Sequence, residues 1–278
     1  MLKFLCLLLV SAGPLTAATQ KQLTLRATES PVMVDGIIDA VWNTADSVSD
    51  FFQMQPYYSR SPTRSTTAKL LTTSKALYCL IVCVDDRNNI ESYSGVLDQV
   101  NGDVVSVMLD TFGDRQTAYK FAVAASGVRA DCRLLDDARN RDYSWDGVWF
   151  ADSKVYDWGF VVEMEIPYKS IKYDAGLGEW GLDFDRWIQA SNEDLYWCVY
   201  EQNEGQRISK FGRLNLNGFR PDAEGLNLEV YPVAITKATR LESGKTKTDP
   251  DAGIDIFYNP SQKLTYQLTV NPDFAQIE

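Results

Sequence analysis

The stretch Ser144-Trp145-Asp146-Gly147-Val148-Trp149-Phe150 opens the part of the chain that decides the fold. Two strand-like runs, residues 148–155 and 159–166, follow its Asp-Gly turn and are joined by Tyr156-Asp157-Trp158. In the second run apolar and acidic side chains alternate, which is the period-2 pattern of a half-buried strand. The apolar set is Val162, Met164 and Ile166, and the acidic set is Glu163 and Glu165. Because Pro167 cannot donate to a ladder, the pattern predicts a β-hairpin at a sheet edge or corner.

The composition of the chain excludes several classes of function. With 27 Lys and Arg against 38 Asp and Glu in 278 residues, the formal net charge is −11. Nucleic acid is therefore not expected as a partner, because phosphate binding needs a basic surface, whereas an acidic surface suits a neutral ligand or a cation. The chain has no histidine, which excludes Ser-His-Asp and Cys-His catalysis within it. Carboxylate-pair chemistry and oxygen-ligated calcium stay open.

The first 18 residues have the features of a secretory signal peptide. Lys3 gives the charged start, residues 4–10 are apolar, and Thr16-Ala17-Ala18 forms a small-residue cleavage site. The apolar run is too short to cross a bilayer as a helix, and an N-terminal hydrophobic strand is the alternative interpretation. The pattern predicts an exported protein of the periplasm, the outer membrane or the cell surface.

Export would leave four cysteines: Cys79, Cys83, Cys132 and Cys198. In one strand Cys79 and Cys83 would lie roughly 13 Å apart, which is beyond the reach of a disulfide. Two pairings remain possible, and free buried thiols are an equally valid alternative.

The spacing of strand-like runs and turn residues predicts an all-β, antiparallel β-sandwich. Residues 77–84 are apolar on both faces, as in a central strand, whereas residues 135–143 are predicted to be a polar loop. A short helical turn begins near Asp39, and Trp42 within it is interpreted as a core anchor. The adjacent carboxylates of Asp85 and Asp86 close a strand, where they belong either to a solvated loop or to a calcium site.

Several motifs follow one another in an order that is specific as a set. They are Val34-Asp-Gly-x-x-Asp-x-x-Trp42, Ala76-Leu-Tyr78, Asp85-Asp86, Leu109-Asp110, Tyr119-x-Phe121, Gly127 to Asp131, Trp145-x-x-x-Trp149, Glu163-Met-Glu-Ile-Pro167, Trp180-Gly181 and Phe211-Gly-Arg213-Leu214. The set resembles carbohydrate-binding module family nine over about residues 30–216. The resemblance implies a β-sandwich domain, here placed at residues 22–216, of a kind found beside glycosidases and on exported proteins.

Residues 217–278 are predicted to be a linker and the start of a barrel-like β region. Residues 264–270 alternate between apolar and polar side chains, which is the weak signature of an outer-membrane β-strand. The ending Asn271-Pro272-Asp273-Phe274 resembles the start of the barrel-type region that follows a family-nine-like module in some exported proteins. The resemblance implies contact with the outer membrane and a chain that is a fragment or truncated; the alternative is that these strands belong to the sandwich.

The resemblance also implies a site in which two tryptophans clamp a terminal sugar. Trp145 and Trp149 fit this role best, followed by Trp197, while Trp158 lies on a turn where it would be exposed. Asn203, with Glu201 and Gln202 beside it, offers hydrogen bonds to sugar hydroxyls. Core packing is the alternative for each tryptophan. The structural calcium of the family implies Asp85, Asp86 and Asp103 as ligands.

Three hypotheses for function follow. The first is non-catalytic binding of a neutral carbohydrate by an exported module that serves polysaccharide capture or catabolism. The second is a glycoside hydrolase, which needs two carboxylates about 5 to 9.5 Å apart, with Glu163 and Glu165 or Asp183 and Asp185 as candidates. The third is a scaffold domain of an outer-membrane barrel protein. Exposed indoles would favour sugar binding, and burial of all seven tryptophans would favour the scaffold.

Overall fold

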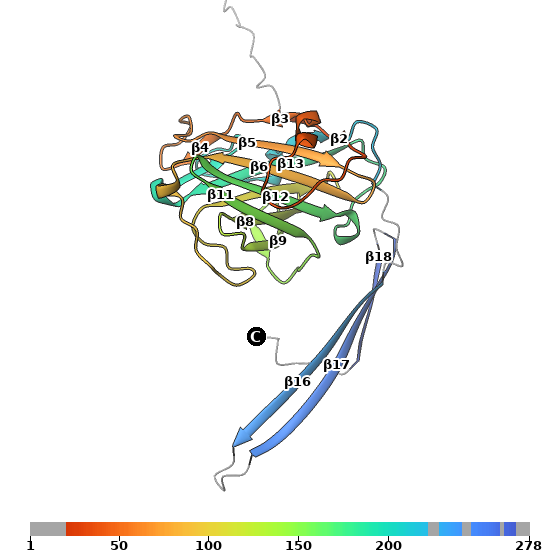
Figure 1. The fold of residues 1–278 in the computed structure, drawn as a ribbon. Helices are drawn as coiled ribbons and strands as arrows, with labels where there is room; N and C mark the ends of the chain where they lie inside the picture. Colours follow the sequence, from red (N-terminus) through yellow and green to blue (C-terminus); the bar gives the residue numbers. More distant parts are fainter. Residues whose placement is uncertain (1–20, 222–227, 241–245, 262–263, 271–278) are drawn as a thin grey trace, which may run out of the picture.

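The computed structural model describes residues 21–221, 228–240, 246–261 and 264–270. Within these ranges two β-sheets form a sandwich, and three further strands form a separate sheet (Figure 1). The predicted all-β sandwich is confirmed. The predicted signal peptide lies outside the described residues. No helix in the described part is long and apolar enough to cross a membrane.

The larger sheet of the sandwich has nine strands in the order β1-β15-β13-β7-β8-β9-β10, with β14 paired to β13 and to β4. These strands are β1 (Gln22–Thr24), β4 (Phe52–Gln55), β7 (Val104–Asp110), β8 (Ala118–Ala124), β9 (Arg129–Leu135), β10 (Asn140–Asp142), β13 (Glu179–Ile188), β14 (Glu193–Tyr196) and β15 (Gly212–Asn215). The predicted loop at residues 135–143 was partly wrong, because β10 lies within it and pairs with β9. The polar side chains of residues 140–142 show no strand pattern, although their backbone pairs with that of β9.

The smaller sheet has six strands in the order β11-β12-β6-β5-β2, with β3 paired to β5. These strands are β2 (Arg26–Ala27), β3 (Ser47–Val48), β5 (Thr66–Thr72), β6 (Ala76–Val84), β11 (Phe150–Tyr156) and β12 (Gly159–Pro167). The hairpin predicted from the opening stretch is β11–β12, and β11 is the edge strand, as expected.

The main core lies between the two sheets. Val162, Met164 and Ile166 of β12 point into it, as their alternation predicts, beside Cys79 and Ile81 of β6. The four described cysteines are free and buried, which agrees with the alternative of unpaired thiols. Burial raises the pKa of the Cys83 thiol to about 12, so this thiol stays protonated at neutral pH.

A second, smaller core covers the outer face of the six-stranded sheet. Trp42, on the short 3₁₀ helix η1 (Ala40–Thr44), packs there against Tyr78, Leu80 and Val161. Both faces of β6 are therefore buried, which explains its continuous apolar run. The remaining 3₁₀ turns are η2 (Arg87–Asn89), η3 (Tyr168–Ser170), η4 (Gln189–Ser191) and η5 (Ile208–Lys210).

Glu163 holds this covering segment in place. Alternation predicts that its side chain faces solvent, but the residue is fully buried beneath residues 35–42. Its carboxylate accepts hydrogen bonds from Trp42 Nε1 at 2.7 Å, Gly36 N at 3.0 Å and Asp35 N at 3.1 Å. Burial raises the pKa of Glu163, and these donors oppose the rise.

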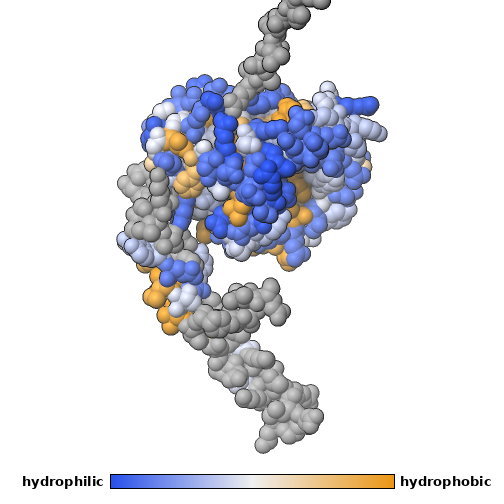
Figure 2. All heavy atoms as spheres, turned by 180° about the vertical axis from the view of Figure 1, so that it is seen from behind, coloured by the Kyte–Doolittle hydropathy of each residue, from blue (hydrophilic) through white to orange (hydrophobic). Residues whose placement is uncertain are grey.

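The third sheet contains β16 (Leu228–Arg240), β17 (Thr246–Ser261) and β18 (Leu264–Val270), paired antiparallel in that order. Its described strands pair with one another and with neither sandwich sheet. The register aligns Val230, Ile256 and Leu268 across the three strands on one apolar face. Val230 and Leu268 are exposed, and orange, hydrophobic spheres appear on the C-terminal strands in Figure 2, where most of the sandwich surface is hydrophilic. Membership of an outer-membrane barrel stays a prediction.

Replacing Glu163 with glutamine tests the role of its carboxylate. Glu163→Gln keeps the volume but turns an amide NH₂ toward N–H donors, so we expect a loss of about 1 to 3 kcal/mol in the free energy of unfolding. Urea denaturation at pH 7 measures it. Asp152→Asn is the matched control, because Asp152 is the exposed cross-strand partner of Glu163 and should change stability by less than about 0.5 kcal/mol. Equal losses of unfolding free energy in the two variants would contradict the role of Glu163 in holding residues 35–42 in place.

Candidate functional site

Two of the predicted sugar-stacking tryptophans are core residues. Trp149 is 2% exposed, donates from Nε1 to Asp131 Oδ2 at 2.6 Å, and meets Phe121 edge-to-face with ring centroids 5.1 Å apart. Trp197 is 1% exposed and donates from Nε1 to Asp50 Oδ1 at 3.0 Å. Neither indole offers an open face to a sugar ring, so the described structure does not fit a stacking role for them.

The other predicted residues lie apart from one another. Trp145 is half-buried against Tyr119, with ring centroids 4.8 Å apart, while Trp158 is exposed on the turn between β11 and β12. Asn203 is exposed in the loop between β14 and η5. Trp145 and Trp149 share Phe121 as a neighbour, and they form the only pair of predicted tryptophans with a common ring contact among the described residues.

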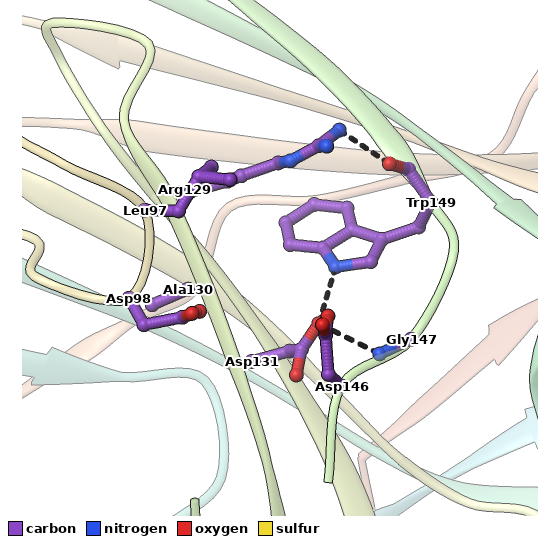
Figure 3. Close-up of a pocket in the computed structure, with 8 residues that line it drawn as sticks. All are labelled: Leu97, Asp98, Arg129, Ala130, Asp131, Asp146, Gly147 and Trp149. Atoms are coloured by element: carbon purple, nitrogen blue, oxygen red, sulfur yellow. Dashed lines mark hydrogen bonds between the residues drawn. The ribbon is translucent and has the colours of Figure 1, made fainter. Parts of the chain in front are cut away.

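A small pocket opens beside Trp149 (Figure 3). Its lining residues are Leu97, Asp98, Arg129, Ala130, Asp131, Asp146, Gly147 and Trp149. Asp131 accepts hydrogen bonds from Trp149 and from Gly147 N, and burial raises the pKa of this carboxyl to about 6. The pocket volume of about 50 Å³ holds one or two water molecules, so it is too small for a sugar ring.

A larger group of polar side chains lies on the outer side of the nine-stranded sheet. Leu182 and Phe184 of β13 point into the core, so Asp185 and Trp187 on the same strand point outward. On the next strand Ser106 is the cross-strand partner of Asp185. Lys120, one strand further on, places its Nζ 2.6 Å from Asp185 Oδ2. We call Ser106, Lys120, Asp185, Trp187, Asp194 and Tyr196 the outer polar face.

The charged groups of the outer polar face are coupled; Asp185 is buried, and Lys120 and Asp194 are partly buried. The side chains of Lys120 and Asp185 are 16% and 9% exposed. Asp194 of β14 hydrogen-bonds to Tyr196, yet burial, together with the charge of Asp185, raises the pKa of Asp194 to about 7. Lys120 and Arg141 oppose this rise. The face thus combines a cation, an anion and a carboxyl that gains or loses its proton near neutral pH.

Ser106 has an unused hydrogen-bonding group in this face. The residue is 1% exposed, and its Oγ has no hydrogen-bond partner. A buried hydroxyl without a partner costs stability, so it marks a place where a ligand hydroxyl or a water molecule would be favoured. Sequence reasoning missed this face, because its members come from four strands and read individually as solvent-facing polar positions.

Neither predicted carboxylate pair forms an open catalytic site. Glu163 is buried, as described above. Asp183 is also fully buried, where it accepts hydrogen bonds from Tyr200 Oη at 2.5 Å and from Cys198 N at 2.8 Å. Glycoside hydrolysis needs both carboxyl groups at the substrate, so these pairs do not fit the hydrolase hypothesis.

The residues predicted for calcium bind other groups. Asp85 is buried and accepts from Arg64 Nε at 3.0 Å and Arg186 Nη2 at 3.2 Å. Asp86 caps η2 by accepting from Asn88 N, while Asp103 Oδ2 accepts from Glu91 N. No group of three or more Asp, Glu or Cys side chains among the described residues is arranged to hold a metal ion. Two guanidinium groups already neutralise Asp85, and a calcium site at Asp85, Asp86 or Asp103 stays a prediction.

Comparison with known proteins agrees with this fold. A module of carbohydrate-binding family 9 from Caldicellulosiruptor kristjanssonii in complex with glucose superposes with a TM-score of 0.53 at 20% identity, over 74% of this chain and all of that chain. The complex with cellotriose gives a TM-score of 0.51 at 20% identity, over 73% of this chain and all of that chain. At this identity the likeness defines the class of fold, a β-sandwich.

The family itself is shown by its model. The chain belongs to the carbohydrate family 9 binding domain-like family, whose model matches residues 34–219. The exoglucanase XynX of Acetivibrio thermocellus is 26% identical over 212 residues, which are 74% of this chain. The match spans only 18% of that relative.

Removing Arg186 tests the charge balance around Asp85. Arg186→Met leaves a buried carboxylate without its main counter-ion, so we expect a loss of about 3 to 5 kcal/mol in unfolding free energy. Arg64→Met is the matched control. Arg64 also contacts Asp85, but its side chain is 41% exposed, so the variant should lose less than about 1 kcal/mol in unfolding free energy. Guanidinium denaturation of both variants measures the difference, and equal losses would contradict this assignment.

The raised pKa of Asp194 predicts a pH-dependent stability. Between its ordinary pKa of 3.8 and about 7, the folded state holds a proton that the unfolded state has lost, so stability falls as pH rises. Asp194→Asn removes this contribution. The free energy of unfolding of the variant, minus that of the natural chain, should therefore increase as the pH rises from 4 to 8. Urea denaturation at several pH values measures the difference.

Asp142→Asn is the control for that series. Hydrogen bonds from Ser144 and Arg133 lower the pKa of Asp142, so its contribution to stability is present above pH 4 and is lost only at more acidic pH. Its difference from the natural chain should stay flat from pH 4 to pH 8. A flat difference for Asp194→Asn as well would show that the carboxyl ionises normally.

Proposed function

We propose that this domain binds neutral carbohydrate without cleaving it, and that the outer polar face holds the sugar. Membership of the family 9 binding domain-like family supports the ligand class. The glucose and cellotriose complexes of fold neighbours support it further. The observation that carries the choice of site is the largely buried Lys120–Asp185 pair beside the unpartnered Ser106 Oγ.

The chemistry of the face matches that of a sugar. Each hydroxyl of a sugar needs both donors and acceptors, which Lys120, Asp185 and Ser106 supply from rigid strands. Because the Lys120–Asp185 pair is already formed, the site presents fixed partners and loses little side-chain entropy on binding.

Aromatic side chains border the same face. Tyr196 contacts Phe52, with ring centroids 6.4 Å apart, and meets Tyr200 edge-to-face at 5.3 Å. Trp187 is half-buried and is held by a hydrogen bond from Nε1 to Gln189 Oε1 at 2.8 Å. Such rings give the apolar C–H face of a sugar a rigid surface at low entropic cost.

The state of the seven tryptophans supports binding over a purely structural role. Trp158 is exposed, Trp145 and Trp187 are half-buried, and the other four, Trp42, Trp149, Trp180 and Trp197, are buried. Burial of all seven was the outcome expected of a scaffold.

The proposal has three finer parts: export, capture of polysaccharide at the cell envelope, and contact of the apolar β16–β18 face with an outer membrane. They rest on the sequence and on the exposed side chains of that sheet.

Disrupting the ion pair tests the proposed function. Lys120→Ala and Asp185→Asn each remove a charged hydrogen-bonding partner, so we expect the affinity for cellotriose to fall by roughly tenfold or more. Isothermal calorimetry and tryptophan fluorescence measure the affinity. Lys210→Ala and Glu204→Gln are matched controls, because that exposed pair has a similar 2.8 Å contact and should not affect binding.

Two outcomes would count against the proposal. Binding that survives both Lys120→Ala and Asp185→Asn would reject the outer polar face as the site. A folded natural chain that binds no mono- or oligosaccharide would reject carbohydrate binding itself.

A further inference from the structure

Trp158 is the most exposed of the seven tryptophans, all of which lie in the described residues. It lies on the turn between β11 and β12 and is 44% exposed. Its ring stacks on Tyr156 with centroids 5.0 Å apart and planes 13° apart. One face of the indole is therefore covered by a parallel tyrosine ring, which leaves the opposite face toward solvent.

The stack is held from both ends. Tyr156 Oη donates to the carbonyl of Gly36 at 2.7 Å, and Lys154 Nζ lies 5.7 Å from the centroid of the tyrosine ring. On the other side, the carbonyl of Trp158 accepts from Asp85 N at 3.0 Å. The tyrosine ring and the backbone of Trp158 are thus held in place, and the indole stacks on that ring, before any ligand arrives, which lowers the entropic cost of stacking.

Gly159 makes this position of the turn possible. Its φ is +151°, and a Cβ there would come within 2.0 Å of the carbonyl oxygen of Cys83. Only glycine allows the turn to lie this close to β6, so the backbone places Trp158 at the rim of the six-stranded sheet.

The surroundings of the indole are polar. Lys154 and Asp157 are exposed beside it, and Asp86 is exposed at the end of β6. A flat apolar ring within a charged rim suits a sugar, whose C–H face stacks while its hydroxyls bind charged groups. It is less suited to an apolar protein or lipid surface, which would have to desolvate those charges.

We propose that Trp158 and Tyr156 form a second carbohydrate platform, separate from the outer polar face and on the opposite sheet of the sandwich. The ligand class rests on the proposed function. Two sites in one domain would allow simultaneous contact with a glycan polymer, and the polymer would be retained more strongly than an oligosaccharide that fills one site.

The test compares stoichiometry and retention in the full chain. Calorimetry with cellotriose should give two sites for the natural chain and one for Trp158→Ala. Electrophoresis through a gel that contains hydroxyethylcellulose should show roughly tenfold weaker retention of that variant, since the stacking contact is lost. Trp158→Phe keeps an aromatic ring and should fall between the two, and it remains informative if the alanine variant does not fold.

Phe150→Ala is the matched control, because Phe150 is 50% exposed on the same edge strand β11. It should bind like the natural chain. Loss of one site in Trp158→Ala, and of the other in Lys120→Ala, would establish two independent platforms. A single site that Lys120→Ala abolishes and Trp158→Ala leaves unchanged would overturn this inference while the proposed function stands. No cellotriose or polymer binding by the natural chain would reject both.

Discussion

Hydrogen bonds from indole N–H groups to carboxylates organise this structure. Trp42 donates to Glu163, Trp149 to Asp131 and Trp197 to Asp50. A buried indole without a partner for its N–H would cost free energy, and a carboxylate is the strongest acceptor that a protein offers. The pairs are 121, 18 and 147 residues apart in sequence. The first two bonds fix η1 onto β12 and a loop onto β9, and the third joins two loops. Some of the acidic residues of the chain therefore accept hydrogen bonds from tryptophans, while others contribute surface charge.

The same bonds shape what remains for a ligand. They take Trp149 and Trp197 into the core, and they cover the outer side of the six-stranded sheet with the segment around Trp42. On the outer polar face, Lys120 neutralises Asp185, and the buried Ser106 hydroxyl has no hydrogen-bond partner. Trp158 stays exposed because it lies on the turn between β11 and β12, at the rim of the sheet. The two candidate sites are thus the places that the anchoring bonds do not use.

Burial of carboxyl groups has a consequence for a chain without histidine. Burial raises the pKa values of Asp131 and Asp183 to about 6 and of Asp194 to about 7. These groups give the molecule a titration near neutral pH that its composition does not suggest. One of them, Asp194, lies within the outer polar face. The charge of that face therefore changes with pH near neutrality.

The amino-acid sequence alone determined the sandwich, its edge hairpin and its central strand. Alternation in residues 160–166 and the apolar run of β6 follow from local chemistry, because a strand must bury the side chains that its period places on one face. The order of motifs also indicated the family. Only the tertiary structure decided which tryptophans are buried, that Glu163 lies beneath a distant segment, and that Ser106, Lys120 and Asp185 meet on one face. Those contacts join residues far apart in the chain, and their partners are set by strand order and loop placement, which no local pattern encodes.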